Sequence, residues 1–369
     1  MNTEKTQIGV AIVGCGNIST SYAEQILNYL EIKLLGFSDL DLSRAQECVQ
    51  NYGGKVYADL DELLGDPEVD IVVNLTIHIA HAEVIRKCLE AGKHVHSEKP
   101  ISMTSKEAWG LVKLAEEKGL RFSSSPITYM GEAQDAAWSV INSGKLGTVR
   151  LVYAEVNHGF IEVWHPNPLP FYDLGALWDV GVYPLTLMTA FFGPVRRVLG
   201  YSKVLKKDHV TMNDEPFSIT TPDFYHGIIE MASGVTCRLT ANFYAKMSYQ
   251  GGSLEFHGDE GRLKLGDFQN FNAPVELGEY GEPYRKVNHN GVGEEKYIEF
   301  SRGVQDMAGA ILEDRPTRSS PTQAAHVIDV IVALLKSMET GEFVGVDSDF
   351  VPPVPMKYEY SVEAPAETI

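Results

Sequence analysis

A glycine-rich segment near the N-terminus combines residue types that could hold a phosphate group. Residues 14–19 read G-C-G-N-I-S and come directly after an apolar run and before a helical pattern. Gly14 permits a tight turn, Gly16 lets backbone approach a pyrophosphate on a helix N-terminus, and the small Ser19 allows close packing of helix on strand. This order of strand, loop and helix predicts a dinucleotide site. The loop residues expected to contact the cofactor are Gly14, Gly16, Asn17 and Ile18.

Asp39 is the second part of the predicted dinucleotide site. It lies about 20 residues after Gly16, at the end of the second apolar run, where a carboxylate accepts hydrogen bonds from the adenosine ribose. The alternative is a turn aspartate that caps the helix starting near Leu42. Asp39 and Asp41 would repel a 2′-phosphate, which favours NAD over NADP. Arg44 could accommodate that phosphate, although its simpler role is a surface position on the helix.

Lys99 stands where hydride chemistry needs a cation. Removing a hydride from a secondary alcohol requires a group that takes the hydroxyl proton and a positive charge that holds the developing alkoxide. Lys99 follows an apolar strand, at the carboxyl edge of a predicted parallel sheet, where ligands bind in doubly wound folds. Pro100 restricts Lys99 to extended backbone geometry and so fixes where its side chain points. These features predict a catalytic role for Lys99.

The elements that must position these residues differ between the two parts of the chain. Up to residue 126, short β-branched runs alternate with helical patterns, which is typical of a doubly wound parallel sheet. From about residue 150, alternating strands joined by turn signals indicate a large, open, mostly antiparallel sheet. Residues 267–296 look like surface loop. The strands of the second sheet are expected at 149–158, 226–243 and 252–266, and helices at 303–313 and 322–338.

These patterns predict an α/β protein with two domains and a tail. An NAD-binding Rossmann domain is expected at 1–126. A substrate-binding and oligomerisation α/β domain, which carries the open antiparallel sheet, is expected at 127–347. Residues 348–369 are rich in proline and acidic residues, so an extended tail that reaches a neighbouring subunit is expected there.

Two further segments give the chain a resemblance to a known family. Residues 76–81 read T-I-H-I-A-H and residues 91–100 read AGKHVHSEKP. With the glycine-rich start, they resemble the glucose–fructose oxidoreductase and inositol dehydrogenase family (Gfo/Idh/MocA). In that family a T-P-x-x-x-H stretch lines the nicotinamide side and the EKP segment carries the catalytic lysine; here Ile77 replaces the proline. The resemblance implies cofactor contacts from Thr76, His81, Glu98 and Lys99.

A third segment, GALWDVGVYPL at 175–185, extends the resemblance and carries Asp179 and Tyr183. It implies that both residues are catalytic and contact the substrate together with Lys99. Tyr183 stands at the family's histidine position, where branches resembling glucose–fructose oxidoreductase and dihydrodiol dehydrogenase also carry tyrosine. The spacing of four predicts one face of a helix; the alternative is a buried tyrosine with a capping aspartate.

Two arrangements of the proton transfer follow from the tyrosine. The cationic Lys99 could lower the pKa of Tyr183 and make Tyr183 the proton acceptor, which is the favoured arrangement. Alternatively, Lys99 takes the proton itself and Tyr183 orients the substrate. The loop after the 149–158 strand adds candidate substrate-binding residues. The alternatives there are a core position for the tryptophan and ordinary loop roles for the histidines. These candidates are His158, Trp164 and His165.

Composition excludes several classes of protein. Lys and Arg number 31 against 50 Asp and Glu, and the net charge of -19 repels nucleic acid and anionic membranes. No apolar run approaches the roughly 20 residues needed to span a bilayer, and no leader peptide is expected. Four cysteines without a pairing pattern indicate reduced thiols in a cytoplasmic protein. The histidine pair of residues 78–81 lacks a nearby carboxylate triad and already lies in the cofactor motif, so no metal is expected.

By resemblance, the expected function is NAD-dependent hydride transfer between nicotinamide and a secondary alcohol or carbonyl of a sugar, sugar acid or cyclitol. Two alternatives stay open. One is an enzyme that keeps and recycles its NAD for epimerisation, sugar-to-sugar hydride transfer or oxidative glycoside cleavage, and the other is a non-enzymatic NAD-sensing protein. Family members often form dimers or tetramers through the open sheet face. An exposed sheet of this size should be covered, so a homodimer or homotetramer is expected.

Overall fold

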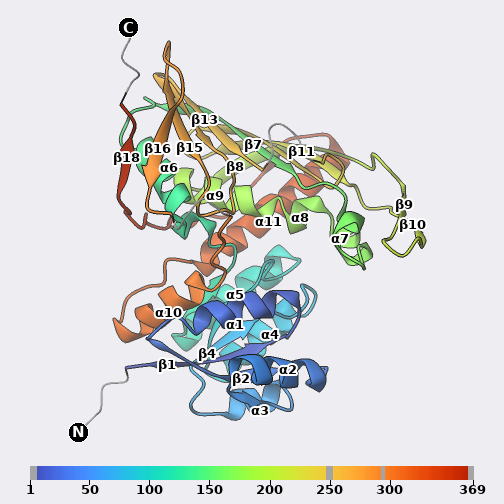
Figure 1. The fold of residues 1–369 in the computed structure, drawn as a ribbon. Helices are drawn as coiled ribbons and strands as arrows, with labels where there is room; N and C mark the ends of the chain where they lie inside the picture. The colour runs from blue at the N-terminus through green and yellow to red at the C-terminus, as the bar shows by residue number, and fades with distance from the viewer. Residues whose placement is uncertain (1–5, 247–251, 292–295, 365–369) are drawn as a thin grey trace. The chain divides into compact units, whose positions relative to one another are not determined.

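The computed structural model describes residues 6–246, 252–291 and 296–364. The chain divides into two compact units, which are taken one at a time (Figure 1). Unit 1 comprises Met1–Ile127 and Glu299–Ile328, and unit 2 comprises Thr128–Ile298 and Asp329–Ile369. Within the described residues, no helix is both long enough and apolar enough to cross a membrane.

The described residues of unit 1 form a six-stranded parallel sheet in the order β3-β2-β1-β4-β5-β6, which confirms the predicted Rossmann fold. The strand order reverses between β1 and β4. In open α/β sheets, ligands bind outside the carboxyl ends of the strands at such a reversal. The elements are β1 (Ile8–Val13), α1 (Asn17–Ile26), β2 (Ile32–Ser38), α2 (Leu42–Tyr52), β3 (Lys55–Val56), α3 (Leu60–Gly65), β4 (Ile71–Asn74), α4 (His81–Glu90), β5 (His94–Ser97), α5 (Ser105–Lys118), β6 (Phe122–Ser124) and α10 (Arg302–Leu312).

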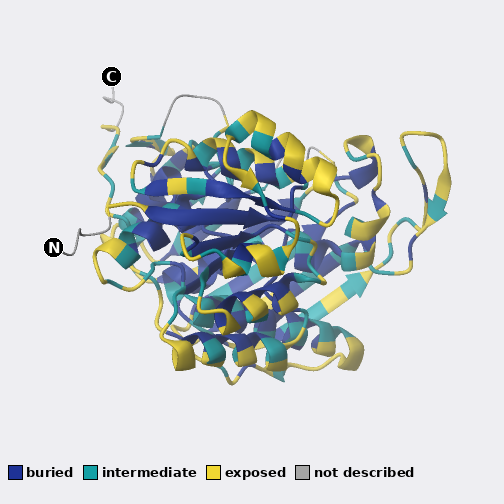
Figure 2. Cartoon of the chain, turned by 90° about the horizontal axis from the view of Figure 1, so that it is seen from below, coloured by how far each residue is buried: buried dark blue, intermediate teal, exposed yellow. Residues whose placement is uncertain are grey.

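The strands of this sheet are buried, and the helices beside them are exposed on their outer sides (Figure 2). Ile12 of β1 packs in one core with Tyr22 of α1 and Met307 of α10. Helix α10 also contacts β5 and β6. The segment Glu299–Ile328 therefore belongs to unit 1 because the apolar side of α10 is buried in that core. The expected division at 127–347 placed this segment in the second domain.

The described residues of unit 2 form a ten-stranded sheet in the order β17-β8-β11-β12-β7-β13-β14-β15-β16-β18. Within the described chain, β7 and β12 run parallel and the other neighbours are antiparallel. This confirms the predicted mostly antiparallel sheet. A separate hairpin joins β9 to β10. The strands are β7 (Val149–Asn157), β8 (Val195–Lys203), β9 (Asp208–Val210), β10 (Pro216–Ser218), β11 (Phe224–Met231), β12 (Thr236–Asn242), β13 (Leu254–Gly258), β14 (Gly261–Leu265), β15 (Val275–Glu279), β16 (Arg285–His289), β17 (Val344–Gly345) and β18 (Tyr360–Val362).

One face of this sheet is covered by helices. Helix α6 contacts β14, β15 and β16, and α8 contacts β11 and β12. Leu334 and Met338 of α11 lie against Gly227 and Gly200, where a side chain would collide with them. The other face presents Ile228, 37% exposed, and Tyr201, 57% exposed. The helices are α6 (Glu132–Asn142), α7 (Leu169–Leu174), α8 (Ala176–Asp179), α9 (Val182–Phe192), α11 (Pro321–Thr340) and the 3-10 turns η1 (Thr128–Met130) and η2 (Ile161–Val163). The residues of α11 up to Ile328 belong to unit 1.

Three strands, β15, β16 and β18, lie in segments that were expected to be surface loop or tail. The prediction of a surface loop at 267–296 was wrong over β15 and β16, which pair with each other and extend the sheet; part of this range, 292–295, lies outside the described residues. The described part of the tail, residues 348–364, contains no helix and folds back on the sheet of its own unit. Its strand β18 pairs with β16. The predicted reach of the tail to a neighbouring subunit stays a prediction.

Asp135 of α6 holds the tail in place. Its buried carboxylate accepts the backbone N–H groups of Met356 at 2.7 Å, Lys357 at 3.1 Å and Tyr358 at 2.8 Å. Burial raises the pKa of Asp135, while these three hydrogen bonds act in the opposite direction. The N–H groups of the tail therefore satisfy the buried Asp135 carboxylate.

Candidate active site

Three turns of unit 1 meet at the carboxyl edge of its sheet. Strands β1, β4 and β5 are neighbours, and they are followed by the glycine-rich loop, by Thr76 and by the Glu98–Lys99 turn. The loop and the Thr76 turn are in close contact, because a side chain at Gly14 would lie 2.6 Å from the Leu75 carbonyl group. Gly14 also has φ +92°, which glycine adopts without strain. The structure thus brings the predicted cofactor loop beside the other predicted turns of unit 1.

The start of α1 offers open backbone to a ligand. Gly16 precedes the first turn of the helix, and the space where its side chain would lie is empty within 4 Å. Ser19 is buried, donates a hydrogen bond to the Gly16 carbonyl oxygen at 2.7 Å, and lies 3.9 Å from the Cys48 sulfur atom. Helix α1, which is described in full, has no acidic residue in its first turn. The first turn of α1 therefore carries no negatively charged side chain that would repel an anionic pyrophosphate.

Asp39 connects the end of β2 to the glycine-rich loop. Its carboxylate accepts the Cys15 N–H at 2.6 Å and the Asp41 N–H at 2.8 Å. The cap of α2 is Asp41, which accepts the Ser43 N–H at 3.0 Å. The capping role that was the alternative for Asp39 is therefore filled by its neighbour. Each carboxylate oxygen has a second acceptor position, so Asp39 can still receive ribose hydroxyl groups.

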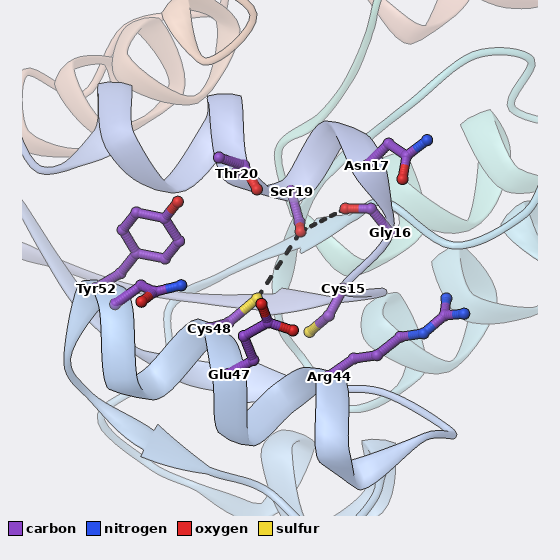
Figure 3. A pocket seen from close by; sticks show the side chains of 10 residues that line it. Cys15, Gly16, Asn17, Ser19, Thr20, Arg44, Glu47, Cys48 and Tyr52 are labelled. Carbon is purple, nitrogen blue, oxygen red and sulfur yellow. Dashed lines mark hydrogen bonds between the residues drawn. The ribbon is translucent and has the colours of Figure 1, made fainter. Parts of the chain in front are cut away.

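A cavity of about 350 Å³ opens beside the loop (Figure 3). Arg44 extends past Cys15 on the same side as Gly16 and Asn17, and its nearest ion-pair partner is Asp41 at 3.7 Å. Burial and the neighbouring Cys48 thiol raise the pKa of Cys15, which keeps this thiol neutral. The open backbone, the uncharged thiol and the nearby Asp39 carboxylate fit the pyrophosphate and ribose of NAD. The lining residues are Cys15, Gly16, Asn17, Ser19, Thr20, Arg44, Glu47, Cys48, Asn51 and Tyr52.

His81 braces the turns that follow β4 and β5. Its ring nitrogens lie 2.8 Å from the carbonyl oxygens of Pro100 and Thr76, and the residue is 2% exposed. Burial lowers the pKa of His81 despite these two carbonyl neighbours. Asn74 adds a second brace, because its side chain accepts the Thr76 hydroxyl at 2.7 Å and donates to the Ser97 hydroxyl at 3.1 Å. His81 therefore acts on the site through the backbone of both turns, and its predicted cofactor contact stays a prediction.

In unit 2, Asp179 and Tyr183 lie on two different short helices. Asp179 is the last residue of α8, and Tyr183 is in the first turn of α9. The prediction that both lie on one helix was wrong, because the helix is interrupted at Val180 and Gly181. The Gly181 N–H returns to the Ala176 carbonyl oxygen at 2.9 Å, which closes α8 before α9 begins. Both side chains are half-buried.

The loop after β7 gathers the aromatic residues that were predicted to bind substrate. The ring of Trp164 lies 5.6 Å from that of His158, 5.4 Å from that of His165 and 5.4 Å from that of Phe171. Trp164 is 48% exposed, so it is not a core residue. The structure thus brings the three predicted residues into one cluster with an accessible indole ring. Phe171, which joins the cluster from α7, was not predicted.

A buried carboxylate in the same loop is the centre of a hydrogen-bond network. Glu162 in η2 accepts the Tyr172 hydroxyl at 2.7 Å and lies 2.8 Å from the His209 ring. Burial favours the neutral acid, but the hydrogen bonds from His209 and Tyr172 outweigh it and lower the pKa of Glu162. The sequence analysis did not identify this network, because its members come from three separate segments of unit 2.

Comparisons with known proteins match both parts of the chain. Residues 8–125 match the model of an oxidoreductase family with an NAD-binding Rossmann fold, and residues 135–264 match the GFO/IDH/MocA C-terminal domain. Trans-1,2-dihydrobenzene-1,2-diol dehydrogenase of Macaca fascicularis is 30% identical over 244 residues, which cover 65% of this chain and 71% of that enzyme. The enzyme of the same name from Homo sapiens matches with the same identity and coverage.

Solved structures share the fold over most of this chain. An NAD binding oxidoreductase from Klebsiella pneumoniae has a TM-score of 0.82 at 20% identity, covering 93% of this chain and 100% of that one. Levoglucosan dehydrogenase in complex with NADH and levoglucosan has a TM-score of 0.81 at 17% identity, again covering 93% and 100%. With the family models and the identity to the macaque enzyme, this shows that the chain belongs to the GFO/IDH/MocA family of oxidoreductases and carries an NAD-binding Rossmann domain at residues 8–125.

Proposed function

We propose that this oxidoreductase transfers a hydride between NAD and a secondary hydroxyl or carbonyl group on a sugar, sugar acid or cyclitol. The observation that carries this proposal is the edge of the unit 1 sheet. There the glycine-rich loop, the Thr76 turn and the Glu98–Lys99 turn follow three neighbouring strands. A cation at Lys99 beside a dinucleotide loop is what oxidation of an alcohol requires.

The chain's own residues divide the chemistry between them. Bound NAD would supply the acceptor for the hydride that leaves the alcohol carbon. The loop residues Gly16 and Asn17 and the Asp39 carboxylate hold the cofactor by its pyrophosphate and ribose. Lys99 holds the developing alkoxide charge, and Tyr183 takes the hydroxyl proton, with Asp179 orienting the substrate. Thr76, Ile18 and Glu98 complete the proposed cofactor contacts.

The substrate class is supported by the relatives and by the aromatic cluster. The curated relatives are named for a dihydrodiol, and one fold neighbour is named for levoglucosan. Both names describe cyclic compounds with ring hydroxyl groups. Trp164 offers an accessible aromatic face on which the apolar side of such a ring can lie, with His158 and His165 beside it as hydrogen-bonding groups.

A substrate panel tests this function. Aldoses, uronates, inositols and cyclic trans-diols are incubated with the protein and NAD, and NADH formation is followed by its absorbance. At least one member of the panel should give NADH at a rate that the Lys99→Ala variant loses. If purified protein retains about one equivalent of NAD and gives no net NADH with any compound, the recycling enzyme replaces the dehydrogenase.

We also propose that the protein is a cytoplasmic homodimer or homotetramer that associates through the open face of the unit 2 sheet. The exposed Tyr201 and Ile228 on this face supply apolar area. Tyr153 lies beneath the guanidinium of Arg238, which pairs with Glu155 and gives the face polar groups of both signs. All four cysteines are free thiols, as a reducing compartment allows.

A further inference from the structure

The hydroxyl group of Tyr22 is the centre of a buried polar cluster in unit 1. The cluster reaches Glu98 of the proposed site, whereas the proposed reaction gives the phenol itself no role. Tyr22 lies on α1 and is 0% exposed. Its hydroxyl donates to the Glu98 carboxylate at 2.7 Å. The same oxygen lies 2.9 Å from the Ser125 hydroxyl and 3.4 Å from Nε2 of His96. Residues from α1, β5 and the turn after β6 therefore meet at one phenol group.

His96 borders this cluster as a neutral imidazole held in place by its neighbours. Its Nδ1 lies 2.7 Å from the Ser123 hydroxyl, and burial lowers the pKa of its ring to about 4. Gly303 of α10 lies directly against the ring, because a side chain there would come within 2.6 Å of it. A neutral imidazole cannot form an ion pair with Glu98. The partner that the cluster offers to one oxygen of this carboxylate is therefore the phenol proton of Tyr22.

Glu98 is held at several points around the turn that carries Lys99. Its Oε1 accepts the Tyr22 hydroxyl, and its Oε2 accepts the backbone N–H of Lys99 at 3.2 Å. Its own N–H donates to the Asn74 carbonyl oxygen at 2.9 Å. Hydrogen bonds to a charged acceptor are about twice as strong as neutral ones, so the phenol strongly restricts the carboxylate.

We propose that Tyr22 is a positioning residue, which fixes the Glu98 carboxylate and, through it, the backbone from which the Lys99 side chain extends. This proposal rests on the catalytic role of Lys99 stated above. A small displacement of a catalytic group lowers the rate strongly while binding changes little. Tyr22 thereby affects turnover more than cofactor affinity.

The test compares Tyr22→Phe with Tyr57→Phe. Tyr57 is also 0% exposed, and its hydroxyl donates to the Asp66 carboxylate at 2.9 Å, away from the lysine turn. Each variant removes one buried phenol–carboxylate hydrogen bond and keeps the ring. Tyr22→Phe should lower kcat about tenfold or more with the NAD Kd within about threefold, whereas Tyr57→Phe should leave both values unchanged. If the two variants behave alike, the proposal is overturned.

A double-mutant cycle tests whether Tyr22 acts through Glu98. In the Glu98→Gln background, the fold decrease in kcat caused by Tyr22→Phe should be less than half of the fold decrease that it causes in the unmodified protein. The reason is that the restricted carboxylate is already gone. If the fold decreases in kcat of the two single variants simply multiply in the double variant, the proposal is contradicted. Hydrogen exchange measured by mass spectrometry gives a readout without turnover. Backbone exchange over residues 95–102 should be faster in Tyr22→Phe and unchanged in Tyr57→Phe, with or without NAD.

Two further variants keep the outcome decisive. If Tyr22→Phe does not fold, Ser125→Ala removes the neighbouring hydroxyl and should lower kcat at least threefold at unchanged NAD Kd; an unchanged kcat overturns the proposal. Lys99→Ala separates the two proposals. If Lys99→Ala keeps its activity, the proposed function of Lys99 fails. If Lys99→Ala is inactive and Tyr22→Phe matches Tyr57→Phe, only the positioning role of Tyr22 fails.

Discussion

Replacing Asp39 by asparagine should remove the preference for NAD over NADP. Asparagine is the informative substitution because the Asp39 carboxylate also accepts the partly buried Cys15 N–H at 2.6 Å. Asparagine can keep its oxygen on that N–H, while the more exposed Asp41 N–H can turn to water. Alanine would instead leave the Cys15 N–H without its acceptor, which costs about 1–3 kcal/mol and disturbs the loop itself.

The size of the effect follows from two contributions. A ribose hydroxyl bound to a carboxylate contributes about 1 kcal/mol more than one bound to a neutral amide, so NAD should lose about fivefold in kcat/KM. Two unit charges 4 Å apart in water interact by about 1 kcal/mol, so repulsion of a doubly charged 2′-phosphate is about 2 kcal/mol. NADP should therefore gain about 30-fold. Together the two changes act on the ratio of kcat/KM for NAD to that for NADP. The combined change is as large as the roughly 30- to 150-fold preference for NAD that we expect of the unmodified protein.

The assay measures initial rates with NAD and NADP on one substrate, together with NADH and NADPH binding by fluorescence. Asp41→Asn serves as the comparison, because it removes a charge from the same turn while asparagine keeps the helix cap. It should change the NAD to NADP ratio by less than about tenfold. Equal use of both cofactors by the unmodified protein, or an unchanged ratio in Asp39→Asn, would refute the reasoning and point to Arg44 as the residue that selects the cofactor.

Four other outcomes are expected. Lys99→Ala should lower kcat by about 10²-fold or more with the NAD Kd within a few-fold, measured by steady-state kinetics and cofactor titration. Tyr183→Phe should cost about 10²-fold and abolish the rise of kcat/KM for alcohol oxidation towards alkaline pH. The pKa of His96 in the folded protein, about 4, lies below its ordinary 6.5, so its contribution to stability is complete above pH 6.5 and is lost as the pH falls towards 4. Because burial also lowers the pKa values of His81 and His94, the loss of unfolding free energy between pH 7 and pH 4, measured by urea unfolding, should be about 3 kcal/mol smaller in His96→Gln than in the unmodified protein. Ile228→Glu should shift the sedimentation coefficient to that of a monomer.

The parts of the fold that could be predicted are those written into contiguous sequence. The run from β1 through Gly14 and Gly16 into α1 carries its own strand, turn and helix signals, and so does the αL glycine, Gly119, at the end of α5. Strands β15 and β16 could not be recognised, because their segment is rich in turn-forming residues. They are strands because they continue the sheet beyond β14, and that is a nonlocal cause.

The candidate site shows the same division. Lys99 and Asp39 were identified because short motifs place them at strand ends. Tyr22 was not identified, because its partner Glu98 lies 76 residues away and nothing local to α1 indicates the contact. The alternation of β5 could have given a partial signal, since Glu98 follows His96 by two residues, just beyond the end of the strand. The break between Asp179 and Tyr183 could not be predicted from their spacing, because it lies in the backbone hydrogen bonds of Val180 and Gly181, both of which return to the Ala176 carbonyl oxygen.

The tail that Asp135 holds in place protects one edge of the unit 2 sheet from pairing with another chain. Without β18, strand β16 would present unpaired backbone groups at the end of the remaining nine strands, where another chain could add a strand. The tail covers that edge with β18, a three-residue strand flanked by Glu359 and Glu363, which is too short and too charged to recruit a further strand. Removing the tail would therefore have two effects. The buried Asp135 carboxylate would lose its three donors, and the backbone edge of β16 would be open to pairing with another chain.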